Sequence, residues 1–220
     1  MITPRTECII KNITKRNIAD IGTDHAYIPI YLIKNNICDK VIATDIKKGP
    51  LEIAKYNINK YNLLNKIEVR LGNGFECIKK DECEQSVIAG MGGNVICNIL
   101  SDLNDENMQL ILQPMNYQYE LRKYLLSNNY KITYEDIAME GFKVYNVICA
   151  KKGIFDSDIS KDIYFHIPKE LSSHKYFENL LEKKKREFLK ILTGNKKSIY
   201  PDKTIIEKYE NLLSELESLY

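Results

Sequence analysis

Apolar, β-prone runs alternate with helix-like segments along this chain, and that order is what most constrains its fold. The β-prone runs span residues 17–21, 40–45, 66–71, 86–89 and 108–113. Between them, apolar residues recur with helical periodicity over 26–35, 49–61, 94–103 and 117–128. Parallel strands need a crossover between them, and strands buried on both faces are continuously apolar. The alternation predicts an α/β protein with a doubly wound parallel sheet.

Two further β-like runs, 131–139 and 142–150, meet at Glu140-Gly141. So short a link joins only antiparallel neighbours. We therefore expect the sheet to close with an antiparallel hairpin. An amphipathic segment, 3–13, precedes the first strand.

The pattern changes past Lys152. The stretch 156–162 is polar and turn-prone, which divides the 220 residues into a predicted domain at 1–153 and a second at 154–220. Pro168 is expected to open one helix, and a second is expected after Pro201. The apolar stripes of these helices are Phe177, Leu181, Phe188 and Ile191, broken at Lys184, and then Ile205, Tyr209, Leu212, Leu216 and Leu219. The spacing predicts an antiparallel, coiled-coil-like helical hairpin.

Composition excludes several classes of protein. The net charge is only +2, so affinity for nucleic acid requires a local basic face. The six cysteines form no C-x-x-C pair, and no cysteine or histidine has zinc-site spacing, so we predict no metal. No signal peptide and no membrane-spanning run is recognisable, so we predict a cytoplasmic protein with no membrane partner.

The first strand ends in "DIGTDHA", which contains Asp20, Gly22 and Asp24. A nicotinamide dinucleotide fold would place G-x-G-x-x-G here, and only one of those glycines is present. Two carboxylates repel a pyrophosphate and attract a cation. The expected ligand is therefore positively charged.

The residues at the ends of the next four strands indicate what else the ligand contains. Asp45 stands where nucleotide-binding sheets place an acid on ribose hydroxyls. Asn73, between Gly72 and Gly74, can bond an adenine edge. The fourth strand ends in "AGMGG", with a thioether at Met91, and the fifth in "LQPM". A sulfonium attached to adenosine meets these demands together, which predicts S-adenosylmethionine as cofactor.

Five motifs, in this order and with similar gaps, resemble the bacterial tRNA adenine-22 N1-methyltransferase family. They are "ADIGTDHAYIPIYL" (19–32), "DIKKGPLEIAK" (45–55), "RLGNGF" (70–75), "AGMGG" (89–93) and "LILQPM" (110–115). The resemblance runs from Arg5 to about residue 150, and the helical tail is similar only in kind. It implies a Rossmann-like class I methyltransferase domain, a coiled-coil-like tail and position 22 of tRNA as target. One departure is "FHIP" (165–168), where the family is expected to have Gly-Pro.

The resemblance also implies roles for residues. The acceptor side would be formed by Asp24, His25 and Tyr27. The cofactor would be bound by Asp20, Gly22, Thr23, Asp45, Ile46, Asn73, Gly74, Gly90, Met91 and Gly92.

For the reaction itself, adenine N1 carries a free lone pair, so alignment and exclusion of water are expected to dominate. We expect Asp24 to stabilise the positive charge of the product adenine. Tyr27, Phe75 and Tyr117 are candidate stacking surfaces for an extruded base.

Phosphate contacts are expected from two basic groups. Arg5, Lys11, Lys15 and Arg16 cluster in the sequence just before the catalytic loop, and Lys184 and Arg186 lie in "KKKR" (183–186). The second group could equally pair across the helical hairpin or be solvated.

Structural alternatives stand beside these roles. Asp20 and Asp24 could cap the following helix, His25 could be a hydrogen-bonded structural residue, and Met91 and Tyr27 could be packing residues. The rival functions are a methyltransferase acting on another RNA or a small molecule, and a noncatalytic RNA-binding module. We expect a monomer.

Overall fold

The computed structural model describes residues 2–153 and 161–220. Seven strands form one sheet in the order β3-β2-β1-β4-β5-β7-β6. Their bounds are β1 Asn17–Ile21, β2 Lys40–Asp45, β3 Ile67–Leu71, β4 Gln85–Met91, β5 Gln109–Pro114, β6 Tyr130–Glu140 and β7 Lys143–Lys152. The first five strands are parallel, and β7 is antiparallel to both β5 and β6. The predicted α/β class, with a doubly wound sheet that an antiparallel hairpin closes, is confirmed.

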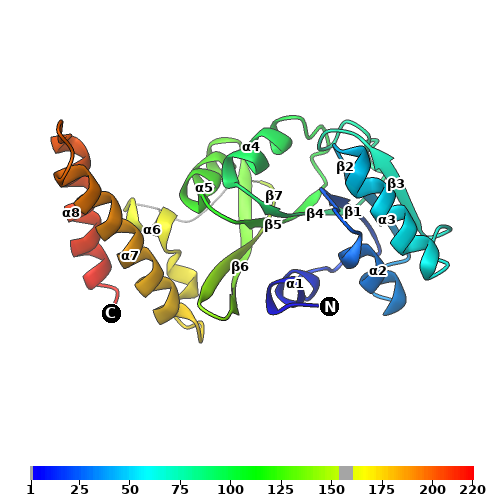
Figure 1. The fold of residues 1–220 in the computed structure, drawn as a ribbon, viewed down its shortest axis with the longest axis horizontal. Coiled ribbons are helices and arrows are strands. Elements are labelled where there is room, and N and C mark those ends of the chain that lie inside the picture. The colour runs from blue at the N-terminus through cyan, green and yellow to red at the C-terminus, as the bar shows by residue number, and fades with distance from the viewer. Residues whose placement is uncertain (1, 154–160) are drawn as a thin grey trace.

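Helices cover both faces of the sheet (Figure 1). One face packs against α1 Pro4–Ile10, α2 Tyr27–Lys34 and α3 Lys48–Lys60, and the other against α4 Gly93–Ser101 and α5 Gln118–Ser127. The first helix begins where its sequence predicts a start, because the Thr3 side chain accepts a hydrogen bond from the Thr6 N–H and Pro4 occupies the first turn. Buried Ile9 and Ile10 then fix α1 to the sheet.

The turn between β6 and β7 lies one residue further along than predicted. Glu140 pairs with Lys143, so the two-residue loop is Gly141-Phe142 and not Glu140-Gly141. Gly141 has a φ of +57°, which a two-residue hairpin loop requires at its first position. The glycine therefore sets the position of the turn.

The tail contains α6 Ile163–His166, a 3-10 turn at Lys169–Leu171, α7 Phe177–Lys196 and α8 Lys203–Glu217. The second start after Pro201 is confirmed, with Asp202 capping Thr204 and Ile205. The first is wrong, because Pro168 opens only the 3-10 turn and α7 begins at Phe177.

The two long helices run antiparallel, as predicted. Lys196 near the end of α7 pairs with Glu210 near the middle of α8, and Lys185 pairs with Glu217. The predicted stripe of α7 needs one correction, since Ile191 is 42% exposed and Leu192 is buried instead. Leu181 and Phe188 are buried as predicted, so the correction is confined to this end of the stripe.

The tail shares a hydrophobic core with the closing hairpin of the sheet. Ile137 of β6 and Val144 of β7 lie in one buried cluster with residues of the tail helices, among them Leu180 and Phe188. The motif "FHIP" belongs to this contact, because the His166 ring stacks on Tyr119 of α5 at 4.3 Å between centroids. The predicted boundary at 153 adjoins residues 154–160, which lie outside the described residues. These include 156–160 of the stretch 156–162 that was predicted to be turn-prone. The division into two domains stays a prediction.

Polar contacts also join the tail to the sheet and to α5. Arg122 of α5 forms a buried ion pair with Glu135 of β6 and donates a 2.9 Å hydrogen bond to the Phe165 carbonyl. His174 lies 2.9 Å from Asp136, which also pairs with Lys11. Within residues 2–153 and 161–220, no helix is long and apolar enough to cross a membrane.

Candidate active site

The loop after β1 has an unusual backbone. Gly22, Asp24 and Ala26 have φ values of +75°, +51° and +58°, a conformation that costs free energy for residues other than glycine. The N–H groups of Gly22 and Thr23 both donate to the Thr44 carbonyl at 2.8 Å, which ties the loop to the end of β2. Left-handed residues that the surroundings hold in place are typical of functional sites.

Asp20 and Thr23 are buried at the base of this loop and are joined by a hydrogen bond. The Thr23 hydroxyl donates a 2.7 Å hydrogen bond to the buried Asp20 carboxylate. Burial raises the pKa of Asp20 to about 6, and the carboxylate of Asp45 adds to the shift. Both residues were predicted to bind cofactor, and the structure places neither in the wall of the pocket described next.

A pocket of about 330 Å³ opens at the carboxyl ends of β1 to β4. Six of the predicted cofactor residues line it, namely Gly22, Asp45, Ile46, Asn73, Gly74 and Met91. Gly72, expected to allow a close approach of the backbone to the adenine, also lines it. Sequence reasoning missed the remaining lining residues as cofactor contacts, namely Ile21, Thr44, Val95, Asn98, Ile99 and Asp102. The last four recur at intervals of three, one and three residues, which places them on one face of α4.

Two polar side chains of the pocket wall fit a nucleoside. Asp45 can accept hydrogen bonds from ribose hydroxyls, and Asn73 can bond an adenine edge. Thr44 also lines the pocket, and among the described residues its buried hydroxyl has no hydrogen-bond partner.

Met91 closes the pocket against the first loop. A Cβ added at Gly22 would lie 2.0 Å from the Met91 methyl carbon, so a larger residue would displace the end of this side chain, and the φ of +75° favours glycine. Gly92 precedes α4, and neither it nor Gly90 lines the pocket. At Gly93, an added Cβ would lie 2.3 Å from the Tyr117 carbonyl oxygen. The glycine run therefore allows the ends of β4 and β5 to pack closely beside the pocket.

The three predicted catalytic residues lie together beside this pocket. The side chain of Asp24 is 67% exposed, and its carboxylate is 3.6 Å from Nε2 of His25. The rings of His25 and Tyr27 are 5.5 Å apart, and Asn57 of α3 donates to the His25 carbonyl. Helix α2 begins without a side-chain cap, which removes the alternative in which Asp20 or Asp24 caps it.

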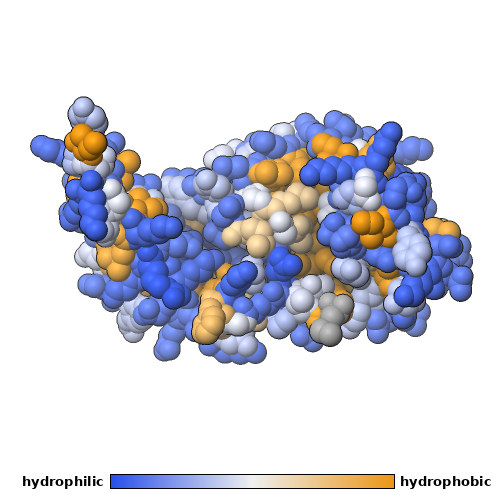
Figure 2. All heavy atoms as spheres, viewed as in Figure 1, coloured by the Kyte–Doolittle hydropathy of each residue, from blue (hydrophilic) through white to orange (hydrophobic). Residues whose placement is uncertain are grey.

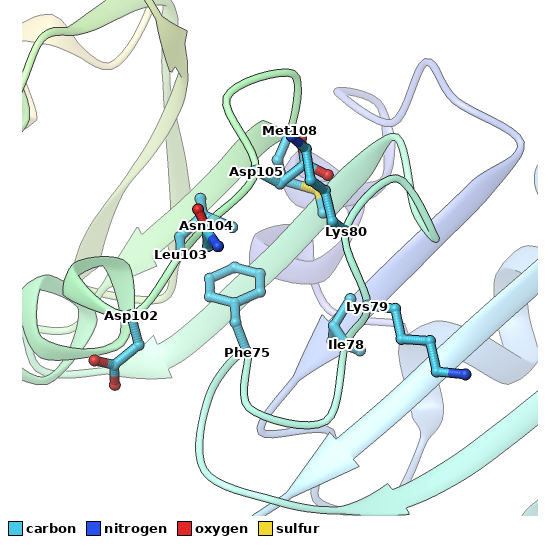
Figure 3. A pocket seen from close by; sticks show the side chains of 9 residues that line it. All are labelled: Phe75, Ile78, Lys79, Lys80, Asp102, Leu103, Asn104, Asp105 and Met108. Atoms are coloured by element: carbon cyan, nitrogen blue, oxygen red, sulfur yellow. The ribbon is translucent and has the colours of Figure 1, made fainter.

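Of the candidate stacking residues, Tyr27 and Tyr117 are exposed, whereas Phe75 is buried. Figure 3 shows Phe75 in the wall of a neighbouring cavity of about 150 Å³, which shares Asp102 with the nucleoside pocket. The prediction for Phe75 is wrong, because its ring belongs to the core beneath α4.

Arg5 lies at the same edge of the sheet as the pocket. Its Nη1 donates to Oε1 of Gln113 at 3.4 Å, and that oxygen also accepts a hydrogen bond from Gly90 N. Gln113 is fully buried, and only its place at a strand end pointed to it before its bridging role was seen.

The other predicted phosphate contacts do not join Arg5. Arg16 precedes β1, at the opposite edge of the sheet, where it pairs with Asp39 and bonds the Asn36 carbonyl. Lys15 lies next to it and pairs with Glu84, and Lys11 pairs with the buried Asp136. These four cations, close together in the sequence, are therefore spread over both edges of the sheet. Contact of each residue with RNA stays a prediction.

The two predicted phosphate contacts of α7, in the basic run 183–186, differ in their exposure. Lys184 is 4% exposed and its ammonium lies 2.8 Å from Glu187, whereas Arg186 is exposed and donates to the Glu182 carbonyl. Lys184 lines a cleft of about 960 Å³ between the start of α5 and the tail helices. In the structure, Lys184 therefore pairs with Glu187 of the same helix and not across the hairpin.

The strand order, the helices on both faces and the nucleoside pocket at the strand ends define a class I S-adenosylmethionine-dependent methyltransferase fold. Within residues 2–153 and 161–220, no group of three or more potential ligands is arranged to hold a metal ion. A family model described as tRNA (adenine(22)-N(1))-methyltransferase matches residues 18–219. The chain belongs to this family.

Individual relatives agree with the assignment. The tRNA (adenine(22)-N(1))-methyltransferase of Bacillus subtilis is 40% identical over 148 residues, which cover 66% of this chain and 61% of that protein. The structure of M. capricolum TrmK in complex with S-adenosyl-homocysteine has a TM-score of 0.83 and 29% identity, covering 99% of this chain and 97% of that one. A putative tRNA (m1A22) methyltransferase of Streptococcus pneumoniae, in complex with S-adenosyl-L-methionine, has a TM-score of 0.84 and 26% identity, covering 100% and 99%.

Proposed function

We propose that this protein transfers a methyl group from S-adenosylmethionine to N1 of adenine 22 in tRNA. Family membership is one support. The observation that carries the proposal is the meeting of the nucleoside pocket with an exposed Asp24, His25 and Tyr27 loop at one edge of the sheet. Cytoplasmic location and a monomeric state belong to the same proposal.

The residues of the pocket fit the cofactor. Asp45 would bind the ribose hydroxyls, and Asn73 the adenine edge, beside the unpaired Thr44 hydroxyl. Gly22 and Met91 would face the methionine end, where the Asp20 carboxylate nearby favours a cation. The cofactor supplies an electrophilic methyl group on a sulfonium.

The acceptor adenine must be held in position, but it does not need to be activated. N1 of adenine has a lone pair at neutral pH, so no base is required before the methyl transfer. Tyr27 and Tyr117 are exposed on the loop after β1 and at the start of α5. Their rings would hold an extruded adenine in place and exclude water.

Asp24 would act on the charge that the transfer creates. Its carboxylate is exposed at the rim, and the left-handed backbone at this residue fixes its direction. A carboxylate at the acceptor stabilises the cationic N1-methyladenine as it forms, or accepts a proton from the exocyclic amino group. His25, 3.6 Å away, would orient that carboxylate.

The test is incubation of the purified protein with labelled S-adenosylmethionine and unmodified tRNA, followed by nuclease digestion and nucleoside mass spectrometry. The expected product is 1-methyladenosine, which disappears when adenine 22 is replaced. A product at another position, or methylation of free metabolites alone, would contradict the proposed acceptor. Failure to bind S-adenosylmethionine would contradict the enzyme assignment itself.

A further inference from the structure

The most exposed large apolar side chain of the described residues lies at the catalytic edge of the sheet. Phe142, in the turn between β6 and β7, is 98% exposed. Since β7 is antiparallel to β5, its first residues lie beside the end of β5. Figure 1 shows β6 and β7 on the side of the sheet that faces α7.

The turn does not require an aromatic residue. Gly141 takes the left-handed position of the two-residue loop, so Phe142 occupies a position that most residues can adopt. A fully exposed phenyl ring makes almost no contact within the protein. Its presence therefore adds nothing to the stability of the hairpin.

Arg5 connects this turn to the active site. Its backbone N–H donates to Oε1 of Glu140 at 3.1 Å, and its guanidinium lies 5.3 Å from the ring centre of Tyr145. The same guanidinium donates to Gln113 Oε1, which holds Gly90 of the glycine run. The turn is thus braced against the strand ends that surround the pocket.

The charge of the turn is positive on balance. Lys143 follows Phe142 directly and is exposed, and Arg5 provides a second cation beside the hairpin, while the Glu140 carboxylate offsets part of this charge. An exposed aromatic ring next to cations is a surface on which bases stack while phosphates pair with the cations. Extrusion of a base also leaves a gap in the stack that an apolar wedge can fill.

We propose that the hairpin tip, Phe142 with Lys143, is an RNA wedge, in which the Phe142 ring stacks on a tRNA base next to the extruded target adenine. The inference rests on the proposed function. It adds an RNA contact outside the acceptor loop. Stacking would compensate part of the cost of extruding the target, so the benefit falls on RNA in which that base is otherwise stacked or paired.

The test compares Phe142→Ala, Phe142→Leu and Phe142→Tyr with the wild type in steady-state methylation of a tRNA transcript. Loss of the ring in the first two should lower kcat/KM for tRNA by about tenfold, the lower range of base stacking on aromatic side chains. Phe142→Tyr keeps a ring and should stay near the wild type. The Kd for S-adenosylmethionine, from calorimetry, should not change in any variant.

A matched control lies on the same hairpin. Tyr134 of β6 is 52% exposed near the opposite edge of the sheet, and Tyr134→Ala should leave kcat/KM for tRNA unchanged. A second substrate, a transcript with mismatches that leave adenine 22 unpaired, should make Phe142→Ala nearly as active as the wild type. This result would support a wedge that promotes extrusion.

Three outcomes would overturn the wedge. They are wild-type kinetics in Phe142→Ala, equal losses on the paired and unpaired transcripts, and self-association that depends on Phe142 while tRNA kinetics stay normal. A wild-type protein that methylates no tRNA would instead refute the proposed function. The two failures are therefore distinguishable.

Discussion

The two edges of the sheet both use left-handed backbone, and they use it with different residues. At the edge where the strands begin, the left-handed positions that end α2, α3 and α5 are Asn36, Asn62 and Asn129. Asparagine tolerates this conformation well and is a common helix terminator. At the edge where the strands end, the left-handed positions before α2 and α5 are Ala26 and Tyr117, which tolerate it poorly.

This difference separates structural turns from functional ones. The asparagine turns complete helix ends, as in the hydrogen bonds from Asn36 N to Ile33 O and from Ile37 N to Leu32 O. The turns at Ala26 and Tyr117 have no side-chain cap and flank exposed Asp24 and the Tyr117 ring. Strain is therefore concentrated where side chains must be aimed at a ligand.

The largest effect is expected from Gly22→Ala. Alanine rarely adopts the φ of +75° found at this position, and the flexible end of the Met91 side chain would also have to move away from the new methyl group. Displacement of the loop by about 1 Å should lower methylation by about 100-fold or more. Calorimetry of S-adenosylmethionine binding and turnover assays would measure it.

Gly49→Ala is the matched control for Gly22→Ala. Nothing lies within 4 Å of the added Cβ at Gly49. Its turnover should equal that of the wild type. Normal cofactor binding by Gly22→Ala would show that the close approach to Met91 has no role.

Asp24→Asn should lower turnover by about 100-fold, within the range for a group that acts on charge or protons in the transition state. Because Asp24 does not line the nucleoside pocket, the Kd for S-adenosylmethionine should stay within about twofold of the wild type. Single-turnover methylation with calorimetry separates these quantities. Asp39→Asn, at the opposite edge, is the control, and unchanged turnover in Asp24→Asn would remove this residue from the mechanism.

Asp20→Asn should raise stability at neutral pH. Burial raises the pKa of Asp20 from its ordinary value of 3.8 to about 6, so the folded state binds the proton more tightly and stability falls as pH rises from about 4 to 6. Asparagine removes this loss and can still accept the Thr23 hydrogen bond. The gain at pH 7 should be about 1–3 kcal/mol, and it should vanish near pH 4.

Denaturant unfolding of both proteins from pH 4 to 8 measures the gain of Asp20→Asn. A constant difference across this range would show that Asp20 does not titrate as a buried acid. A loss of stability at pH 7 would show that the charged carboxylate is required beneath the loop.

Much of the fold and of the pocket was predictable from the sequence, because the signals for the sheet and for the strand ends are local. Continuous apolar runs separated by helical periodicity gave the sheet, and Gly22, Asp45 and Asn73 follow their strands directly. The face of α4 that lines the pocket was not predictable, since Val95 and Asn98 are turned toward it by tertiary packing.

Errors arose where position across the sheet matters more than position along the chain. Arg16 is only four residues before Asp20, yet β1 carries the chain across the sheet between them, at about 3.3 Å per residue. Arg16 therefore lies at the edge opposite the loop. The burial of Lys184 was not predictable for a related reason, because the neighbours of α7 decide which of its cations is buried.

The smallest effects should come from Asn36→Ala and Ala26→Gly. Asn36→Ala places a less tolerant residue in a left-handed turn and should cost about 1 kcal/mol of stability with normal turnover. Ala26→Gly relieves strain but adds freedom to the unfolded chain, so stability should change by less than about 1 kcal/mol. Turnover should nevertheless fall severalfold, because a freer backbone aims Asp24 and Tyr27 less well. Chemical denaturation and turnover assays on both variants would decide the matter. If Asn36→Ala lowered turnover as much as Ala26→Gly, left-handed residues would serve the same purpose at both edges.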